Sequence, residues 1–189
     1  MNELYDRIGY GYTTQRRSDP RIFREIRGLL EGMSSLLDVG AGSGSYEPDD
    51  LAVIAVEPSL QMILQHPHRS NVLQAKAEAL PFSDGSFDAT MALLTIHHWN
   101  DQKKGLEECV RVTRSRVVIL TWDPTSDGFW LVQDYFPELL ALDRSIFPGL
   151  EDIRNVLGQL SIQPLPITGR LHGRFSRGLL APATLVSGR

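Results

Sequence analysis

Residues 36–46 read Leu-Leu-Asp-Val-Gly-Ala-Gly-Ser-Gly-Ser-Tyr and are the most informative segment of the chain for its fold. An apolar run reaches Asp38 and continues directly into Gly40, Gly42 and Gly44. Because glycine has no Cβ and adopts positive φ angles freely, such a turn brings its backbone close to a ligand. The amides of the turn can then receive polar ligand groups at the carboxyl edge of a parallel sheet. Glycine is also common in ordinary turns, so the loop alone leaves a plain turn open.

Short apolar runs alternate with segments of helical spacing along the chain. The predicted strands cover 35–39, 51–56, 72–77, 87–96 and 117–122. The predicted helices cover 20–30, 59–66 and 101–112, the first beginning at the N-cap pair Asp19-Pro20. This alternation predicts an α/β fold with a doubly wound, mostly parallel sheet of five or more strands. Ligands bind such sheets in the crevice at the carboxyl ends of the strands.

The composition is that of one globular domain of 189 residues. Nineteen basic against 23 acidic residues give a net charge of −4, which argues against a nucleic-acid partner. No stretch approaches eighteen apolar residues, so no membrane partner is expected. The lone cysteine, Cys109, excludes an intrachain disulfide and favours a reducing compartment, so a cytoplasmic location is expected. Cys109 shares a helix face with Leu106 and is expected in the core.

Three acidic residues stand at or beside the ends of successive predicted strands: Asp38, Glu57 and Glu78. The carboxyl ends of parallel strands line one crevice, so these carboxylates are expected near one another. Glu57 lies 17 positions after Gly40, close to the spacing at which a carboxylate accepts hydrogen bonds from a ribose diol. Any one acid at such a place can simply cap a helix. All three behind a glycine loop favour a nucleoside site.

The chain resembles the class I S-adenosylmethionine-dependent methyltransferases, in particular the small-molecule group that includes the ubiquinone/menaquinone-biosynthesis type. The matching segments are LLDVGAGSGSY (36–46), VIAVEPS (53–59), AEALPFSDGSFDA (77–89), LLTIHHW (93–99) and EECVRVTR (107–114). The resemblance covers about residues 5–140 and implies a Rossmann-like methyltransferase fold. It divides the single domain into an N-terminal arm and helix (1–32), a cofactor-binding core (33–123) and a substrate-side C-terminal segment (124–189). It also implies methyl transfer from S-adenosylmethionine to a small molecule.

The resemblance implies a role for each matching position. Gly40, Ala41, Gly42 and Gly44 would face the amino-acid part of the cofactor, and Asp38 would anchor its ammonium group. Glu57, followed by Pro58, would hold the ribose hydroxyls. Ala77 and Glu78 would meet the adenine edge, and Leu93 and Leu94 would pass beneath the sulfonium. Arg17 in the N-terminal arm would meet the cofactor carboxylate.

Candidates for the catalytic base are His97, His98 and Tyr12. An imidazole titrates near neutrality and can take a proton from the acceptor. A histidine can equally pack at the end of a strand, and Tyr12 can belong to a solvated arm. No metal is expected, because adjacent side chains of an extended strand point apart and His66 and His68 have no carboxylate beside them in the sequence.

Two alternative functions remain. An NAD-dependent oxidoreductase shares the fold class, but its fingerprint requires glycine where this chain has Ser45. A non-catalytic cofactor-binding protein of the same fold would carry the same motifs. The sequence leaves open the acceptor, the accepting atom and the oligomeric state.

Two segments depart from the family pattern. Only six residues separate Gly44 from Leu51, so the helix between the first two strands is expected to be shortened to a turn. No acidic residue follows Asp152, and the arginine-rich end suggests an altered C-terminus, such as a frameshifted or truncated one. A continuous last strand packed in the sheet would contradict that suggestion.

Overall fold

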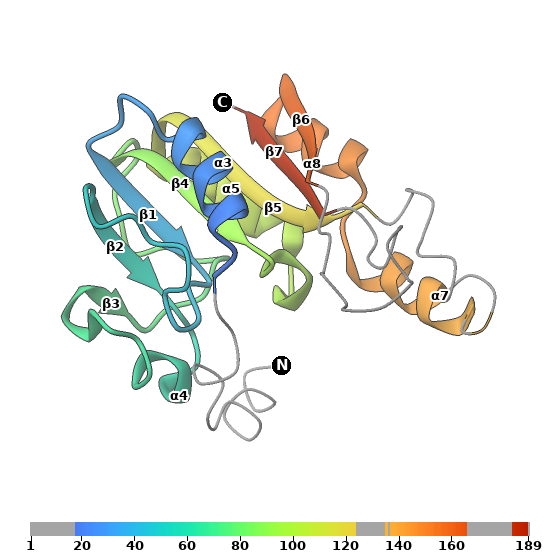
Figure 1. Ribbon diagram of the computed structural model, residues 1–189, viewed down its shortest axis with the longest axis horizontal. Coiled ribbons are helices and arrows are strands. Elements are labelled where there is room, and N and C mark those ends of the chain that lie inside the picture. The colour runs from blue at the N-terminus through green and yellow to red at the C-terminus, as the bar shows by residue number, and fades with distance from the viewer. Residues whose placement is uncertain (1–17, 124–134, 136, 166–182, 189) are drawn as a thin grey trace.

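A single seven-stranded sheet forms the centre of the computed structural model, which describes residues 18–123, 135, 137–165 and 183–188. The strands are β1 (Ser35–Val39), β2 (Ala52–Val56), β3 (Val72–Leu73), β4 (Phe87–Leu93), β5 (Thr113–Trp122), β6 (Leu160–Leu165) and β7 (Ala183–Gly188). Their order across the sheet is β3-β2-β1-β4-β5-β7-β6 (Figure 1). The first five strands pair in parallel, and β7 pairs antiparallel with both β5 and β6. The predicted mostly parallel α/β sheet is confirmed.

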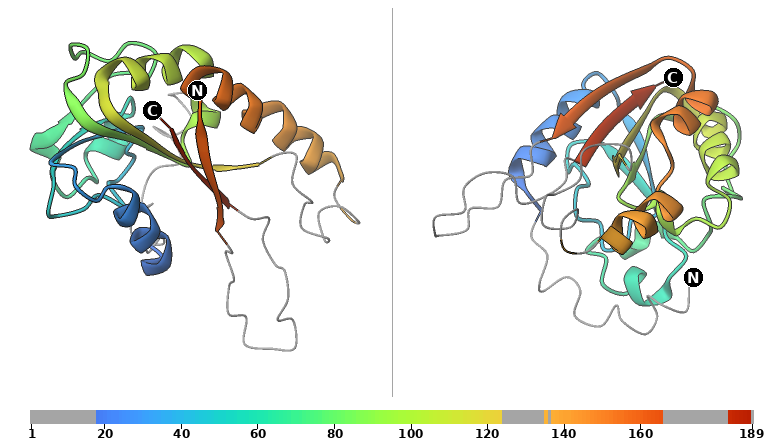
Figure 2. Two further views of the ribbon diagram at one scale, coloured as in Figure 1. Left: turned by 90° about the horizontal axis from the view of Figure 1, so that it is seen from above. Right: turned by 90° about the vertical axis from the view of Figure 1, so that its right-hand side faces the viewer.

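Helices cover both faces of this sheet. The helices are α3 (Pro20–Leu29), α4 (Leu60–Ile63), α5 (Gln102–Val112), α7 (Pro137–Ile146) and α8 (Leu150–Leu157), with 3₁₀ turns at Arg69–Asn71 and Ile96–His98. Helix α3 lies on one face of the sheet, whereas α5 and α8 lie on the other (Figure 2). Neighbouring residues of β1 point into the two cores: Leu36 packs with α3, and Leu37 packs with α5 and α8. None of the described helices is long and apolar enough to cross a membrane.

The helix boundaries follow from their caps. The Asp19 carboxylate accepts from the Arg21 amide at 2.8 Å, and Pro20 occupies the first turn of α3. Asp101 caps α5 through the Lys104 amide at 2.9 Å. Cys109 is fully buried on α5, and this burial raises the pKa of its thiol to about 12, as expected of a core cysteine.

Two predicted strands are shorter in the structure. The expected strand 72–77 ends at Leu73, because residues 74–77 (Gln-Ala-Lys-Ala) lack the β-branched residues that favour a strand and turn away toward the cleft described below. The expected strand 87–96 ends at Leu93, because Leu94 has a φ angle of 52° and leaves the sheet. Glu78 therefore does not directly follow a strand.

The structure describes the whole of the first departure from the family pattern, and residues 153–165 and 183–188 of the second. Residues 41–51 form turns and no helix, which confirms the shortened first crossover. The expectation of an altered C-terminal end is wrong for residues 183–188, which form β7. This strand pairs over six residues with β5, and Leu185 and Val186 are buried. Leu185 packs in the core on one face of the sheet and Val186 in the core on the other, and this burial does not depend on the charge of the neighbouring sequence.

Candidate functional site

An open cleft lies at the carboxyl ends of the parallel strands. Its empty space measures about 1400 Å³, including the part at the mouth that is open to solvent. Its wall contains most of the residues that the sequence singled out: Asp38, Gly40, Ala41, Gly42, Glu57, Pro58, Ala77, Glu78, Leu93, Leu94 and His98. The cleft therefore lies in the predicted crevice of the sheet.

Close packing explains why the turn after β1 begins with glycine. Gly40 has a φ angle of 72°, and a Cβ at this position would lie 2.0 Å from the Thr95 hydroxyl oxygen. Thr95 belongs to the segment that leaves β4 after Leu94, so the loops after two neighbouring strands pack directly on each other. Gly44 packs against His66 instead and is not among the residues of the cleft wall.

The amides of the glycine loop already donate within the protein. Gly40 and Ala41 donate to the Val56 carbonyl, and Gly44 donates to the Ala41 carbonyl. The Gly42 amide donates to the Glu57 carboxylate at 2.9 Å. The glycines allow close approach of the backbone, and the wall beside them carries the Asp38 and Glu57 carboxylates.

Glu57 is a buried and oriented carboxylate. It follows β2, and its side chain is held by two backbone donors: Gly42 on one oxygen and Ser59 on the other, each at 2.9 Å. A carboxylate oxygen has more than one acceptor lone pair, so these bonds fix the side chain without exhausting its capacity. Ser59 also caps α4, which joins this acid to the start of the helix.

Two further acids lie close to Glu57. Asp38 is buried at the end of β1, and the short crossover places Glu47 near it. Burial raises the pKa of Asp38 well above its usual range, and the neighbouring Glu47 and Glu57 carboxylates raise it further. The electrostatic potential around Asp38 is therefore negative, which favours a cationic ligand group there.

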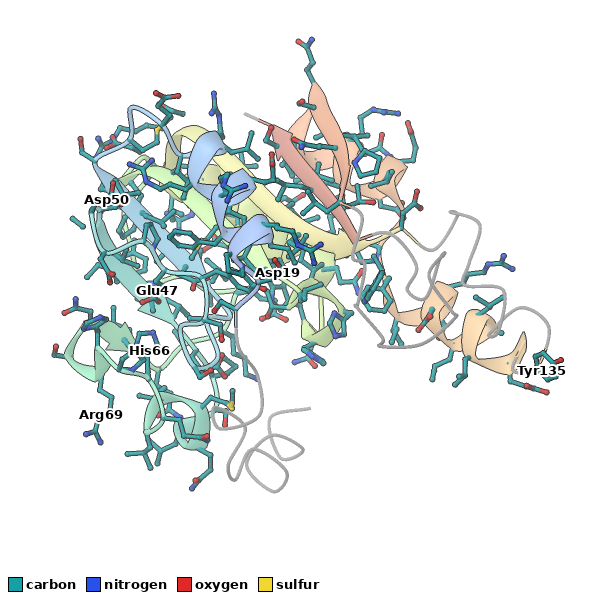
Figure 3. All side chains as sticks on the ribbon, in the orientation of Figure 1. Asp19, Glu47, Asp50, His66, Arg69 and Tyr135 are labelled. Atoms are coloured by element: carbon teal, nitrogen blue, oxygen red, sulfur yellow. The ribbon has the colours of Figure 1, made fainter. Side chains whose placement is uncertain are left out.

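His66 forms a hydrogen bond with Glu47 of this short crossover. Its Nε2 lies 2.9 Å from Glu47 Oε1, and its Nδ1 accepts from the His68 amide at 3.1 Å (Figure 3). Both partners of the pair are almost fully buried, at 0% and 8% side-chain exposure. No carboxylate lies beside His66 and His68 in the sequence, but Glu47 reaches His66 through the tertiary fold. Among the described residues, no three potential ligands gather as a metal site.

Residues 75–78 and 98–100 form the other end of the cleft. The Glu78 carboxylate accepts from the amides of Asn100, at 2.7 Å, and Asp101. Glu78 therefore ties the turn after β3 to the start of α5. Ala77 is buried beside it and lines this end of the cleft.

The two adjacent histidines have different surroundings. They lie in a 3₁₀ turn, where their ring centroids are 3.8 Å apart, so the expectation of an extended chain was wrong. His98 lines the cleft, whereas His97 stacks on Phe147 at 4.4 Å and is not among the cleft residues. Desolvation lowers the pKa of His97 to about 4 and also lowers the pKa of His98.

The sequence analysis missed several cleft residues: Ser18, Tyr46, Met62, Lys76, Thr95, Trp99 and Asn100. Trp99 could have been predicted through Gly105. A Cβ on Gly105 would lie 2.4 Å from the Trp99 ring, so only glycine fits beside it. A glycine inside a predicted helix indicates such close packing. The predicted residues Tyr12 and Arg17 lie outside the described residues.

Comparison with known proteins agrees with this geometry. The family model described as "Methyltransferase domain" matches residues 37–121. A demethylmenaquinone methyltransferase of Renibacterium salmoninarum is 34% identical over 58% of this chain and 47% of its own length. The chain spans about half the length of the curated relatives that it matches.

Solved structures extend the likeness to the whole fold. A methyltransferase structure from Anabaena variabilis, named for an antibiotic biosynthesis pathway, is 32% identical with a TM-score of 0.68, over 79% of this chain and 66% of that one. A SAM-dependent methyltransferase from Thermotoga maritima, 19% identical, has a TM-score of 0.72 over 100% of this chain and 99% of its own, which shows the shared fold. Residues 37–121 thus match a methyltransferase domain, and the sheet that they build has the fold of the S-adenosylmethionine-dependent methyltransferase structures to which the chain is similar.

Proposed function

We propose that the protein transfers a methyl group from S-adenosylmethionine to a small-molecule acceptor. The observation that carries this proposal is the buried Glu57 carboxylate, fixed by two backbone amides at the end of β2 and facing the cleft. A carboxylate so placed suits the two hydroxyl groups of a ribose. Asp38, one strand away, offers a second acid for a cation.

The residues of the wall fit the parts of this cofactor. Asp38 would take the ammonium group and Glu57 the ribose diol, while the glycine loop allows close approach of the amino-acid part. Ala77 and Glu78 would border the adenine, and Leu93 and Leu94 the sulfonium. Residues 33–123 would then form the cofactor-binding core and 124–189 the substrate side, with Arg17 and Tyr12 of the arm completing the site.

The protein itself has to position the reactants rather than activate the methyl group. The cofactor supplies a methyl group already activated on a sulfonium. The wall must hold an acceptor atom in line with that group, at about 3–3.5 Å, and exclude water. His98 is the base candidate that lines the cleft, and it would accept the proton of an oxygen or nitrogen acceptor on an imidazole nitrogen.

A small-molecule acceptor is supported by charge. The net charge of −4 disfavours an electrostatically driven nucleic-acid partner. A reducing, cytoplasmic setting is supported by the single cysteine, which lies in the core.

Calorimetry tests the cofactor assignment. S-adenosylmethionine is expected to bind in the micromolar range, and Glu57→Gln should weaken binding about 10- to 100-fold through loss of a charge-assisted contact. Glu31→Gln, on an exposed acid of the loop after α3, should bind as the wild type does. Binding of NAD without S-adenosylmethionine would contradict the proposal.

Turnover tests the enzyme itself. S-adenosylhomocysteine formation should appear with one class of a panel of phenols, quinols, amines, carboxylates and transfer RNA. Binding without turnover across the panel would instead favour a non-catalytic cofactor-binding protein. Mass spectrometry of co-purified small molecules identifies the acceptor directly.

A further inference from the structure

The short crossover between β1 and β2 brings hydroxyl groups to the cleft in place of a helix. Residues 41–51 form turns, and three of their hydroxyl-bearing side chains line the cleft: Ser43, Ser45 and Tyr46. They differ chemically from the carboxylates of Asp38 and Glu57 in the same wall, because a hydroxyl group can donate a hydrogen bond whereas an ionised carboxylate only accepts. The wall therefore offers donors beside its acids.

The hydroxyl group of Tyr46 is held by the start of α3. The Asp19 amide donates to the Tyr46 oxygen at 3.2 Å, and the Ser18 hydroxyl donates to the Ser45 carbonyl. Asp19, at the start of α3, and Glu47, in the turn, are both labelled in Figure 3. Because the oxygen accepts from Asp19, the Tyr46 hydroxyl proton is left to donate, and within the described part of the chain no acceptor takes it.

Ser43 and Ser45 supply a second donor. Their hydroxyl oxygens lie 3.4 Å apart, which is longer than an ordinary hydrogen bond between hydroxyl groups. Such a bond uses one of the two hydroxyl protons, so at least one remains for a ligand. Ser43 is itself buried, so its hydroxyl group meets the cleft rather than bulk solvent. The turn thus presents two donors, one from Tyr46 and one from the serine pair.

The charged groups around the turn are engaged elsewhere. The Glu47 carboxylate lies 2.9 Å from His66, and Asp19 forms an ion pair with Arg21 at 2.6 Å. Four amides of the glycine loop donate within the protein. Among the described residues of the wall, Lys76 is the one lysine or arginine, and it belongs to the other end of the cleft. An anionic ligand group beside this turn would therefore be held by hydroxyl donors rather than by a cation of the described wall.

We propose that Tyr46 and the serine pair, Ser43 and Ser45, bind the carboxylate group of the cofactor, in place of the helix N-terminus that the shortened crossover lacks. This inference rests on the proposed function, since it needs an amino-acid group in the cleft. Two hydroxyl donors match the two oxygens of one carboxylate, and hydrogen bonds to a charged group are the stronger ones. The Asp19 amide strengthens the Tyr46 donor, because a hydroxyl group that accepts one hydrogen bond donates the next more strongly.

Calorimetry with a matched pair of ligands isolates the carboxylate contact. S-adenosylhomocysteine carries both the ammonium and the carboxylate group, whereas its decarboxylated analogue, S-adenosyl-3-thiopropylamine, keeps the nucleoside and the ammonium group alone. The wild-type protein should bind S-adenosylhomocysteine about 10- to 100-fold more tightly than the analogue. Neither compound carries a methyl group to transfer, so the comparison does not depend on turnover.

Tyr46→Phe and the double variant Ser43→Ala/Ser45→Ala assign the two donors. Each should weaken binding of S-adenosylhomocysteine about tenfold and change binding of the decarboxylated analogue by less than about twofold. A displaced turn would weaken both ligands alike, so the ratio of the two affinities reports the carboxylate contact itself. Tyr135→Phe, on a side chain that is 67% exposed and outside the cleft wall, should bind both ligands as the wild type does. Thermal unfolding of the variants checks that the fold is intact.

The outcomes separate the two proposals. An unchanged affinity ratio in both folded variants, or equal binding of the two ligands by the wild type, would overturn the inference and leave the proposed function standing. Loss of the preference in Arg17→Gln alone would assign the carboxylate to the N-terminal arm and would also overturn the inference. Failure of both nucleosides to bind would contradict the proposed function, and the inference with it.

Discussion

At the residue scale, Gly40 is where two loops of the cleft meet. Its φ angle of 72° disfavours other residues, and Thr95 occupies the place of a Cβ. Gly40→Ala should lower the free energy of unfolding by about 2–4 kcal/mol, since it combines backbone strain with overpacking. Denaturant unfolding measures this loss. Gly28→Ala is the control: a Cβ there meets nothing within 4 Å, and alanine favours the helix. Equal losses of unfolding free energy for the two variants would show that the close approach of Thr95 to Gly40 does not affect stability.

The two histidines after β4 lead to a second prediction at this scale. His98 lines the cleft and His97 does not. With an oxygen or nitrogen acceptor, His98→Ala should reduce kcat at least tenfold, because the imidazole that takes the proton of the acceptor is then missing. His97→Ala should stay within about threefold, or ~0.7 kcal/mol of barrier. The measurement is kcat under saturating cofactor, and turnover of His98→Ala within threefold of wild type would assign catalysis to proximity alone.

At the scale of elements, β7 joins the parallel half of the sheet to its antiparallel edge. Leu185 on β7 is 1% exposed and packs in the core beneath α3, whereas Ile162 on the neighbouring β6 is 37% exposed. Leu185→Ala should cost about 2–4 kcal/mol of unfolding free energy through lost burial and the cavity left behind. Ile162→Ala should cost about 1 kcal/mol or less. Chemical denaturation compares the two, and similar small losses would mean that β7 contributes little to the folded core.

At the scale of the whole molecule, stability should depend on pH through His97. The pKa of His97 is lowered to about 4 in the folded protein, against 6.5 for a free side chain. Between these values the unfolded chain binds a proton that the folded protein does not. This contribution to stability is therefore fully present above pH 6.5 and is lost as the pH falls toward 4.

His97→Phe tests that dependence while keeping an aromatic ring against Phe147. The stability of the variant should fall less steeply than that of the wild type between pH 6.5 and 4, as measured by urea unfolding across that range. The raised pKa of Asp38 acts in the opposite direction in both proteins and cancels in the comparison. Parallel pH profiles would show that His97 is not desolvated in the folded state.

Local signals in the sequence were enough to predict the sheet, the mostly parallel direction of its strands and the edge at which the cleft lies. Hydrophobic runs, caps and glycine positions are local signals, and each reflects an interaction within a few residues along the chain. The same local signals located Asp38 and Glu57, because strand ends can be read from the sequence. The ends of β3 and β4 were harder to predict from the sequence. Leu94 leaves β4 where Thr95 packs on Gly40, and this contact joins residues far apart in the chain.

Which side chains meet becomes visible only in the folded protein. Glu47 reaches His66 because the shortened crossover folds back toward the helix after β2, and no spacing in the sequence encodes that contact. His97 and His98 are adjacent in the chain, yet packing against Phe147 separates their environments. The C-terminal strand was misjudged from its composition, because pairing with β5 depends on backbone hydrogen bonds and alternating burial, to which net charge is a poor guide.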